Sequence, residues 1–174
     1  EFKTGSCRKA LVQLARKGLL KLPAIEETFT FQKSVTQAAT IATPELCCEL
    51  KEIGDISIIL VGDRRSHNAK IWNTLIDCYH YLGLSRECGA QLRYLITSQE
   101  HGYLGAISFR SSILSLAKRD EYIGWSEQAR LTNIDQVVLN SRFLILPGVR
   151  VKNLASHCLS LIISRLADDW EYRY

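Results

Sequence analysis

The chain has 174 residues, of which 47% are hydrophobic and 23% are charged, a composition typical of one globular domain with at most a small appendage. No apolar run approaches the roughly 18–20 residues of a membrane-spanning helix, and the N-terminus lacks the apolar core of a secretion signal, so we expect a cytoplasmic protein. The net charge of +4 is uneven. Residues 1–23 carry six Lys and Arg against one acid, which leaves −1 for residues 24–174 and makes only the first segment a candidate for nucleic-acid contact.

The first 23 residues predict a helix followed by a short extended segment. Ser6 is a suitable N-cap for a helix that runs to Lys17, and Gly18 provides its C-terminal stop. A helix, a glycine and a short strand form the second half of a winged-helix unit. In such a unit, some of the basic residues would face DNA phosphates, although a solvated helix face explains them equally well. These residues are Arg8, Lys9, Arg16 and Lys17.

Residues 24–44 predict a linker, because they are rich in Thr, Gln, Ala and Ser and lie between Pro23 and Pro44. We therefore divide the chain into a basic segment (1–23), a linker (24–44) and a core (45–174).

The core predicts alternating strands and helices of the α+β class, with a mixed, mostly antiparallel sheet and flanking helices. Ile56 to Val61 is an apolar, β-branched run that indicates a strand buried on both faces. Ser66 then caps a helix that carries Leu75 and stops at Gly83. The later elements follow in order: an antiparallel hairpin of 91–97 and 103–109, short helices at 111–119 and 126–133, a strand at 137–147 and a long helix at 153–170.

The six cysteines form no Cys-x-x-Cys pair, and no histidine stands at zinc-finger spacing, so reduced structural thiols are favoured over a metal site. They are Cys7, Cys47, Cys48, Cys78, Cys88 and Cys158. The acidic residues are scattered and predict no nuclease-type or transposase-type metal centre.

The turn before the last helix is the strongest candidate for a ligand site. A helix N-terminus offers unpaired amides and partial positive charge, to which Arg150 and Lys152 add full charges. The turn resembles the pyrophosphate loop of the GNAT acyltransferases, Arg/Gln-x-x-Gly-x-Gly/Ala, with Arg150, Asn153 and Ala155 at its three positions. Asn replaces Gly there but tolerates left-handed backbone angles. The resemblance implies acetyl-CoA or another acyl-CoA bound from Val149 to Ala155; an ordinary strand–helix connection without a ligand is the alternative.

A longer resemblance covers the chain from about Ile56 to its end. The phrases that carry it are Tyr79-His-Tyr-Leu-Gly83, Gly89-Ala-Gln-Leu-Arg-Tyr-Leu-Ile96, Gly102-Tyr-Leu-Gly-Ala106, Arg119-Asp120 with Ile123-Gly-Trp-Ser126, Asn140-Ser-Arg-Phe-Leu-Ile-Leu-Pro147, Asn153-Leu-Ala-Ser-His157 and Asp169-Trp170. In order and spacing they are similar to the DruA family, which is named for the Druantia anti-phage system and also occurs at the start of some transposases. The segment from Ser6 to Pro23 also looks like the leading part of that family.

Two departures from the family bear on function. Gly148 stands where many relatives carry an aromatic residue. The family also continues past the position of Tyr174 with further strands, so we expect a GNAT-like core that is truncated at its C-terminus, and the absence of methionine fits a fragment. Any acyltransferase activity is then expected of the full-length protein and not of this chain.

Three residues outside the turn have two interpretations each. His80 is either a general base or a hydrogen-bonded structural histidine, and Asp120 is either a catalytic carboxylate or a salt-bridge partner of Arg119 or Arg130. His157, in the first turn of the last helix, either contacts an anion or faces solvent.

Three functions remain open at this point. The first is a DruA-type domain of a bacterial anti-phage defence or transposon-associated protein, working with other defence or transposase components and binding an acyl-CoA or another phosphorylated ligand. The second is an accessory module of a transposase that binds DNA through residues 1–23. The third is an inactive fragment of a mobile-element gene.

Overall fold

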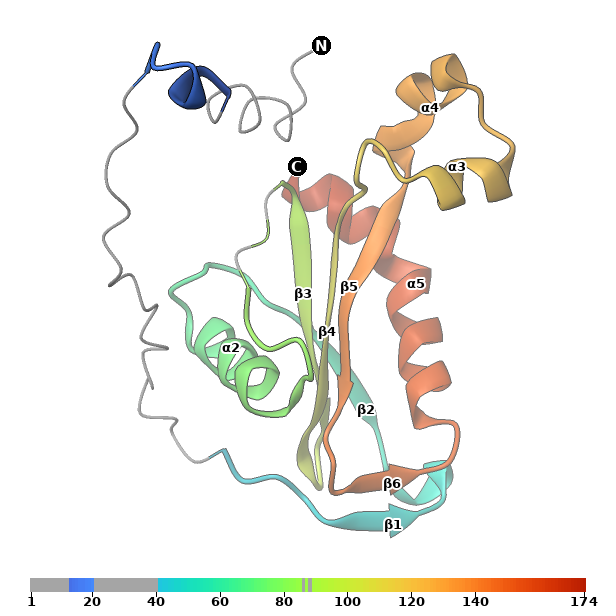
Figure 1. Cartoon of the computed structure of the whole chain (residues 1–174). Coiled ribbons are helices and arrows are strands. Elements are labelled where there is room, and N and C mark those ends of the chain that lie inside the picture. Colours follow the sequence, from blue (N-terminus) through green and yellow to red (C-terminus); the bar gives the residue numbers. More distant parts are fainter. Residues whose placement is uncertain (1–12, 21–40, 86, 88) are drawn as a thin grey trace. The chain divides into compact units, whose positions relative to one another are not determined.

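The structure is a computed structural model that describes residues 13–20, 41–85, 87 and 89–174 (Figure 1). The chain divides into two compact units, residues 1–36 and 37–174. In the first unit, residues 13–16 are helical, and the Gly18 amide donates to the Ala15 carbonyl at 3.0 Å with Gly18 at φ 72°. The predicted stop at Gly18 is thus confirmed. The predicted helix start at Ser6, together with Arg8 and Lys9, lies outside the described residues.

The second unit is built on a four-stranded antiparallel sheet in the order β2-β3-β4-β5. The strands are β2 (Ile56–Leu60), β3 (Gln91–Ser98), β4 (Gly102–Ser111) and β5 (Val138–Ile145). The predicted hairpin is confirmed as β3 and β4, which pair from Gln91 with Arg110 to Ser98 with Gly102. The prediction that β2 is buried on both faces is wrong, because β2 is an edge strand and Ser57 is exposed.

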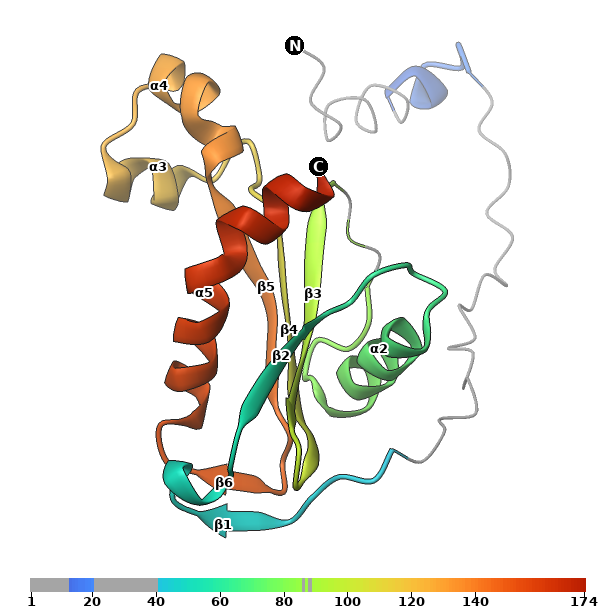
Figure 2. The same ribbon diagram turned by 180° about the vertical axis from the view of Figure 1, so that it is seen from behind.

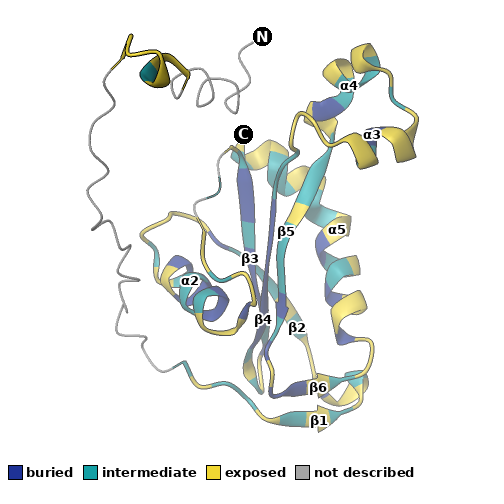
Figure 3. Ribbon diagram, in the orientation of Figure 1, coloured by how far each residue is buried: buried dark blue, intermediate teal, exposed yellow. Residues whose placement is uncertain are grey.

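A helix covers each face of this sheet (Figures 1 and 2). One face packs on α2 (His67–Tyr79) and the other on α5 (Leu154–Arg173). The alternation of side chains along β3 explains this: Tyr94 packs with Ile162 of α5, whereas Leu95 belongs to the cluster of Trp72 and Leu75 in α2. Figure 3 shows that buried residues concentrate along β3 and β4, between the two helices.

The boundaries of two predicted helices are wrong. The helix capped by Ser66 ends at Tyr79 and not at Gly83, because His80 is extended at φ −88° and ψ 131°. The helix predicted at 111–119 is α3 (Ala117–Ile123), since β4 continues to Ser111 and the helix stops at Gly124, which has φ 79°. The next predicted helix is confirmed as α4 (Glu127–Asn133), with a one-turn helix η2 (Ile134–Gln136) after it.

A second, smaller sheet joins the beginning of the core to the segment just before the last helix. β1 (Leu46–Cys48) runs parallel to β6 (Val149–Val151), and η1 (Leu50–Glu52) follows β1. The strand predicted to reach Pro147 therefore ends at Ile145, and a separate short strand precedes the last helix. The α+β class with a mostly antiparallel sheet and flanking helices is confirmed.

Candidate functional site

The turn before α5 has the left-handed backbone that its sequence predicts. Asn153 lies at φ 64° and ψ 5°, the left-handed region that favours glycine. Its side chain makes no capping hydrogen bond, and the first helical bond runs from the His157 amide to the Asn153 carbonyl at 3.0 Å. The amides of residues 154–156 therefore have no acceptor within the helix. The start of α5 presents free donors and the positive end of its dipole.

An open groove of about 710 Å³ lies beside this helix start. It is lined by Glu49, Leu50, Lys51, Gly54, Asp55, Ile56, Lys152, Asn153, His157 and Leu161. The Lys51 ammonium lies 3.1 Å from the Glu49 carboxylate, and both side chains are exposed. Lys152 is the second lysine of the groove. The site thus combines two cations, a histidine and uncapped amides with the carboxylates of Glu49 and Asp55.

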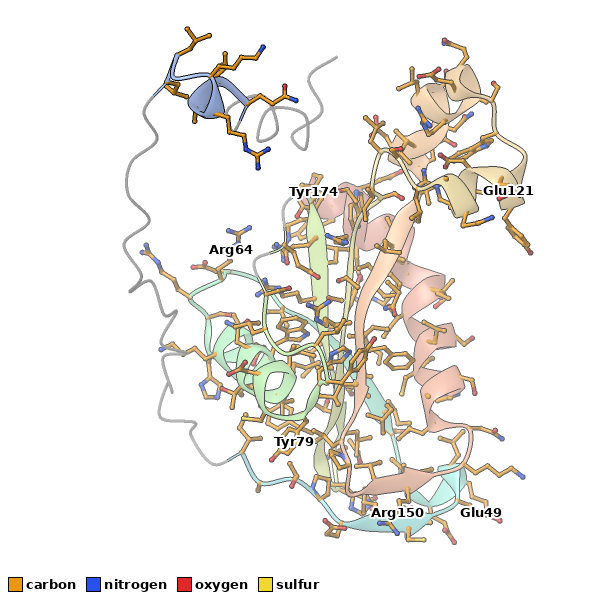
Figure 4. The ribbon with its side chains drawn as sticks, in the orientation of Figure 1. Glu49, Arg64, Tyr79, Glu121, Arg150 and Tyr174 are labelled. Carbon is orange, nitrogen blue, oxygen red and sulfur yellow. The ribbon has the colours of Figure 1, made fainter. Side chains whose placement is uncertain are left out.

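The five residues predicted to bind a ligand at the turn do not all lie in the groove. Lys152 and Asn153 line the groove, and Ala155 is exposed in the first turn of α5. Val149 is buried in the main core. Arg150 is exposed on β6 opposite Cys47 of β1, and it is not among the groove residues. Figure 4 shows Arg150 and Glu49 at the same end of the molecule.

The backbone at Gly148 lies too close to the preceding segment to carry a side chain. A Cβ there would lie 2.5 Å from the Pro44 carbonyl oxygen, and the Gly148 carbonyl accepts from the Leu46 amide at 2.9 Å. The close docking of the segment that leads into β1 therefore leaves room only for a glycine at this position.

Asp120 binds both of its predicted arginine partners. Its Oδ1 accepts from Nε of Arg119 at 2.9 Å, and Arg130 Nη1 lies 3.4 Å from its Oδ2. Burial acts to raise the pKa of Asp120, but the hydrogen bonds from the two arginines outweigh it and hold that pKa below the ordinary value. Both carboxylate oxygens have arginine partners, so Asp120 links α3 to α4 through its ion pair with Arg130.

His80 follows the last residue of α2 and is buried, with its ring stacked on Tyr81. Its Nδ1 accepts from the Leu82 amide at 3.2 Å. Burial, and then the positive charge of Arg142, lower the pKa of His80, so the ring is neutral at pH 7. A general base at His80 remains a prediction.

Figure 1 places α3, which carries Asp120, and β6 at opposite ends of the sheet, so Asp120 and the groove do not form one site.

Four described cysteines are free: Cys158 is buried, Cys48 is half-buried, and Cys47 and Cys78 are exposed. Cys7 and Cys88 lie outside the described residues. Among the described residues, no group of three or more His, Cys, Asp and Glu could hold a metal ion, and no helix there is long and apolar enough to cross a membrane.

A second groove, of about 620 Å³, was not found from the sequence. It is lined by Arg64, Asn73, Leu84, Ser85, Glu87, Gln91 and Arg93. Its residues come from the loop before α2, from α2, from the segment after it and from β3, so no local motif marks it. The phrase that includes residues 89–96 contains two of them, but the phrase only supports a family resemblance.

Comparison with known proteins gives one match. The model of the family described as Druantia protein DruA matches residues 20–174, which is well over half of the chain. No match was found among the curated proteins or the solved structures.

Proposed function

The chain belongs to the DruA family, and from this premise we propose that it is the DruA-type domain of an anti-phage defence or transposon-associated protein and binds a phosphorylated ligand at the start of α5. Acetyl-CoA or another acyl-CoA is the candidate ligand. The other components of such a system are its candidate partners.

The order of elements supports this proposal. β2, α2, the β3–β4 hairpin, β5 and α5 occur in the order of the corresponding elements of the GNAT acyltransferases, with α3, α4 and η2 inserted between β4 and β5 and with β6 between β5 and α5. On this proposal, the turn before α5 takes the place of their pyrophosphate loop. Asn153 adopts the left-handed conformation that the glycine of that loop would adopt.

The observation that carries the proposal is the uncapped start of α5 in a groove with Lys152. Amides without a partner, a helix dipole and an adjacent ammonium group together favour a bound anion. Because Glu49 and Asp55 line the same groove, they would repel a phosphate placed next to them, so its position is restricted to the side of Lys152 and Asn153. In an acyl transfer, these carboxylates and the His157 imidazole would be the available proton acceptors.

Calorimetric titration with millimolar acetyl-CoA tests the proposal. Lys152→Ala should weaken binding several-fold, because a charge-assisted contact contributes about 1.5–3 kcal/mol when fully formed and less in an open groove. Arg150→Ala is the matched control, since Arg150 is an exposed basic residue two positions before Lys152 but lies outside the groove lining. The affinity of this variant should equal that of the wild type.

Ala155→Asp provides a second variant that should fold normally. An acidic residue in the first turn of a helix stabilises that helix, but its charge would repel a bound phosphate, so acetyl-CoA binding should be lost while the melting temperature holds or rises. Absence of binding by the wild type, or an equal loss in Arg150→Ala and Lys152→Ala, would refute the proposal.

A second candidate function is contact of the first segment with DNA. Arg16 and Lys17 are exposed at the end of the helical segment at 13–16, which supports it. Neutralising both residues to glutamine should weaken a gel shift and reduce its dependence on salt. A shift that survives deletion of residues 1–23 would count against this function.

A further inference from the structure

Three arginines converge on two adjoining cavities at the beginning of β3. The groove of about 620 Å³ shares Arg64, Gln91 and Arg93 with a smaller cavity of about 50 Å³, which Arg173 and Tyr174 also line. We call the region around Arg64, Arg93 and Arg173 the arginine pocket. Tyr174 closes one side, since its hydroxyl accepts from the Gln91 amide at 2.7 Å and donates to the Gln91 carbonyl at 3.0 Å. Figure 4 labels Arg64 and Tyr174 near this end of β3.

Uncharged acceptors hold Arg93 in place. Its Nε and Nη2 donate to Gln91 Oε1 at 3.1 and 2.9 Å, and its Nη1 donates to Asn73 Oδ1 at 3.1 Å. The guanidinium carbon lies 4.6 Å from the centre of the Trp72 ring, over its face. Arg93 is thus fixed in one orientation without a carboxylate partner in the described part of the chain.

Arg173 is held in the same way, because its Nη2 donates to the Val61 carbonyl at 2.7 Å. Arg64 is exposed and takes part in none of the hydrogen bonds or ion pairs formed among residues 13–20, 41–85, 87 and 89–174. It lies two residues before Ser66, the N-cap of α2, so the positive end of that helix dipole adds to the field of the pocket.

The acid that lines the larger groove, Glu87, is already paired with another residue. Glu87 lies 3.4 Å from Nη1 of Arg142 in a buried ion pair and accepts from the Ser141 hydroxyl at 3.1 Å. Burial, and after it the charge of Arg64, lower the pKa of Arg93, and Glu87 opposes this only in part. The pocket therefore carries positive charge that the described residues do not neutralise.

We propose that the arginine pocket binds the phosphate group of a nucleotide, either free or within a single strand of nucleic acid. The planar fork of arginine matches phosphate oxygens, and two or three guanidiniums can share one phosphate. The larger groove continues beyond the arginines with Asn73, Ser85 and the apolar Leu84, and its volume is that of a site for a small organic molecule. These residues suit the sugar and base of a nucleotide better than an inorganic ion.

Binding should be measured for the full chain with AMP, ATP, inorganic phosphate and a ten-residue single strand of thymidines, by calorimetry and by fluorescence anisotropy. Arg64→Ala is the test variant, since Arg64 makes no bond within the described fold that its loss would break. Because it removes one charge-assisted contact, affinity should fall about tenfold. The affinity of Arg65→Ala, its exposed neighbour outside the pocket lining, should stay within twofold of the wild type.

The outcomes distinguish the two sources of phosphate. Loss of AMP or ATP binding in Arg64→Ala supports a free nucleotide, and loss of binding of the thymidine strand alone supports a strand. Binding of inorganic phosphate only, no binding of any probe, or an equal loss in Arg65→Ala overturns the proposal. Lys152→Ala should leave these affinities unchanged, so this inference and the proposed acyl-CoA site can fail separately.

Discussion

Replacing Gly105 by alanine would place a methyl group against the neighbouring strand. Gly105 of β4 pairs with Ile145 of β5, and a Cβ there would lie 2.2 Å from the Leu144 carbonyl oxygen. Because real Cβ atoms essentially never approach closer than 3.0 Å, the two strands would have to separate by about 0.8 Å, the difference between 3.0 and 2.2 Å. This is backbone against backbone, and no side-chain rotation relieves it.

The expected cost follows from two opposing effects. Overpacking of a well-packed interior costs about 1–3 kcal/mol, and alanine recovers about 0.4–1 kcal/mol by restricting the unfolded chain. With the middle of each range, about 2 and about 0.7 kcal/mol, the net loss of unfolding free energy is about 1.3 kcal/mol. This corresponds to a fall in melting temperature of about 3–5 °C for a chain of this size.

Thermal unfolding followed by circular dichroism, with urea titration alongside, measures this loss. Gly62→Ala is the matched control, since Gly62 has no positive φ and a Cβ there would meet no atom within 4 Å. Its melting temperature should stay constant or rise slightly. If Gly105→Ala melts at or above the wild-type temperature, or if both variants fall equally, the close approach of β4 and β5 is not the constraint inferred here.

Three further predictions concern stability. Ser66→Ala removes the hydroxyl that accepts from an amide in the first turn of α2 at 3.2 Å, and urea titration should show a loss of about 0.5–2 kcal/mol, whereas no loss would mean that water replaces the cap fully. Tyr94→Phe removes a hydroxyl that donates to Asp169 at 3.0 Å, and this should lower the free energy of unfolding by about 1 kcal/mol. Asp169→Ala should lower it more, because it leaves that buried hydroxyl without its acceptor. A larger loss for Tyr94→Phe than for Asp169→Ala would contradict this hydrogen bond. Asp120 has a pKa held below its ordinary value of 3.8, so its stabilising effect is complete above pH 3.8 and is lost as the pH falls through the folded-state pKa. The difference in stability between the wild type and Asp120→Asn should accordingly shrink below pH 3.8, and a difference that stays constant with pH would refute the ion pair.

Local patterns in the sequence were enough to predict most of the elements. The five-residue turn at 98–102 between β3 and β4, the serine cap at Ser66 and the glycine stop at Gly18 are signals that act over a few residues, and the structure confirms each of them. The start of α3 was missed because strand pairing extends β4 to Ser111. Gly124 is the local signal for the end of that helix, and the prediction of a helix at 111–119 does not use it.

The candidate sites depended far less on local patterns. The conformation of Asn153 could be anticipated because a left-handed turn involves one residue and its neighbours. The arginine pocket could not be anticipated, since Arg64 comes from a loop, Arg93 from the beginning of a strand and Arg173 from the last turn of a helix. Each arginine alone is compatible with an exposed surface, and the three come together only where the loop before α2, the beginning of β3 and the end of α5 line one cavity.

The parallel pairing of β1 with β6 has a thermodynamic consequence for the groove at the start of α5. Three residue pairs form this ladder, and the groove wall between β1 and β2 follows directly after it, with Glu49, Leu50, Lys51, Gly54 and Asp55. A short peripheral ladder opens at a lower free energy than a central sheet. Opening it would dismantle one wall of the groove while the four-stranded sheet remained folded. The groove therefore exists in a local equilibrium between a form with the β1–β6 ladder closed and a form with it open. Hydrogen exchange of the amides of residues 46–48 would measure this equilibrium, whereas global unfolding would not.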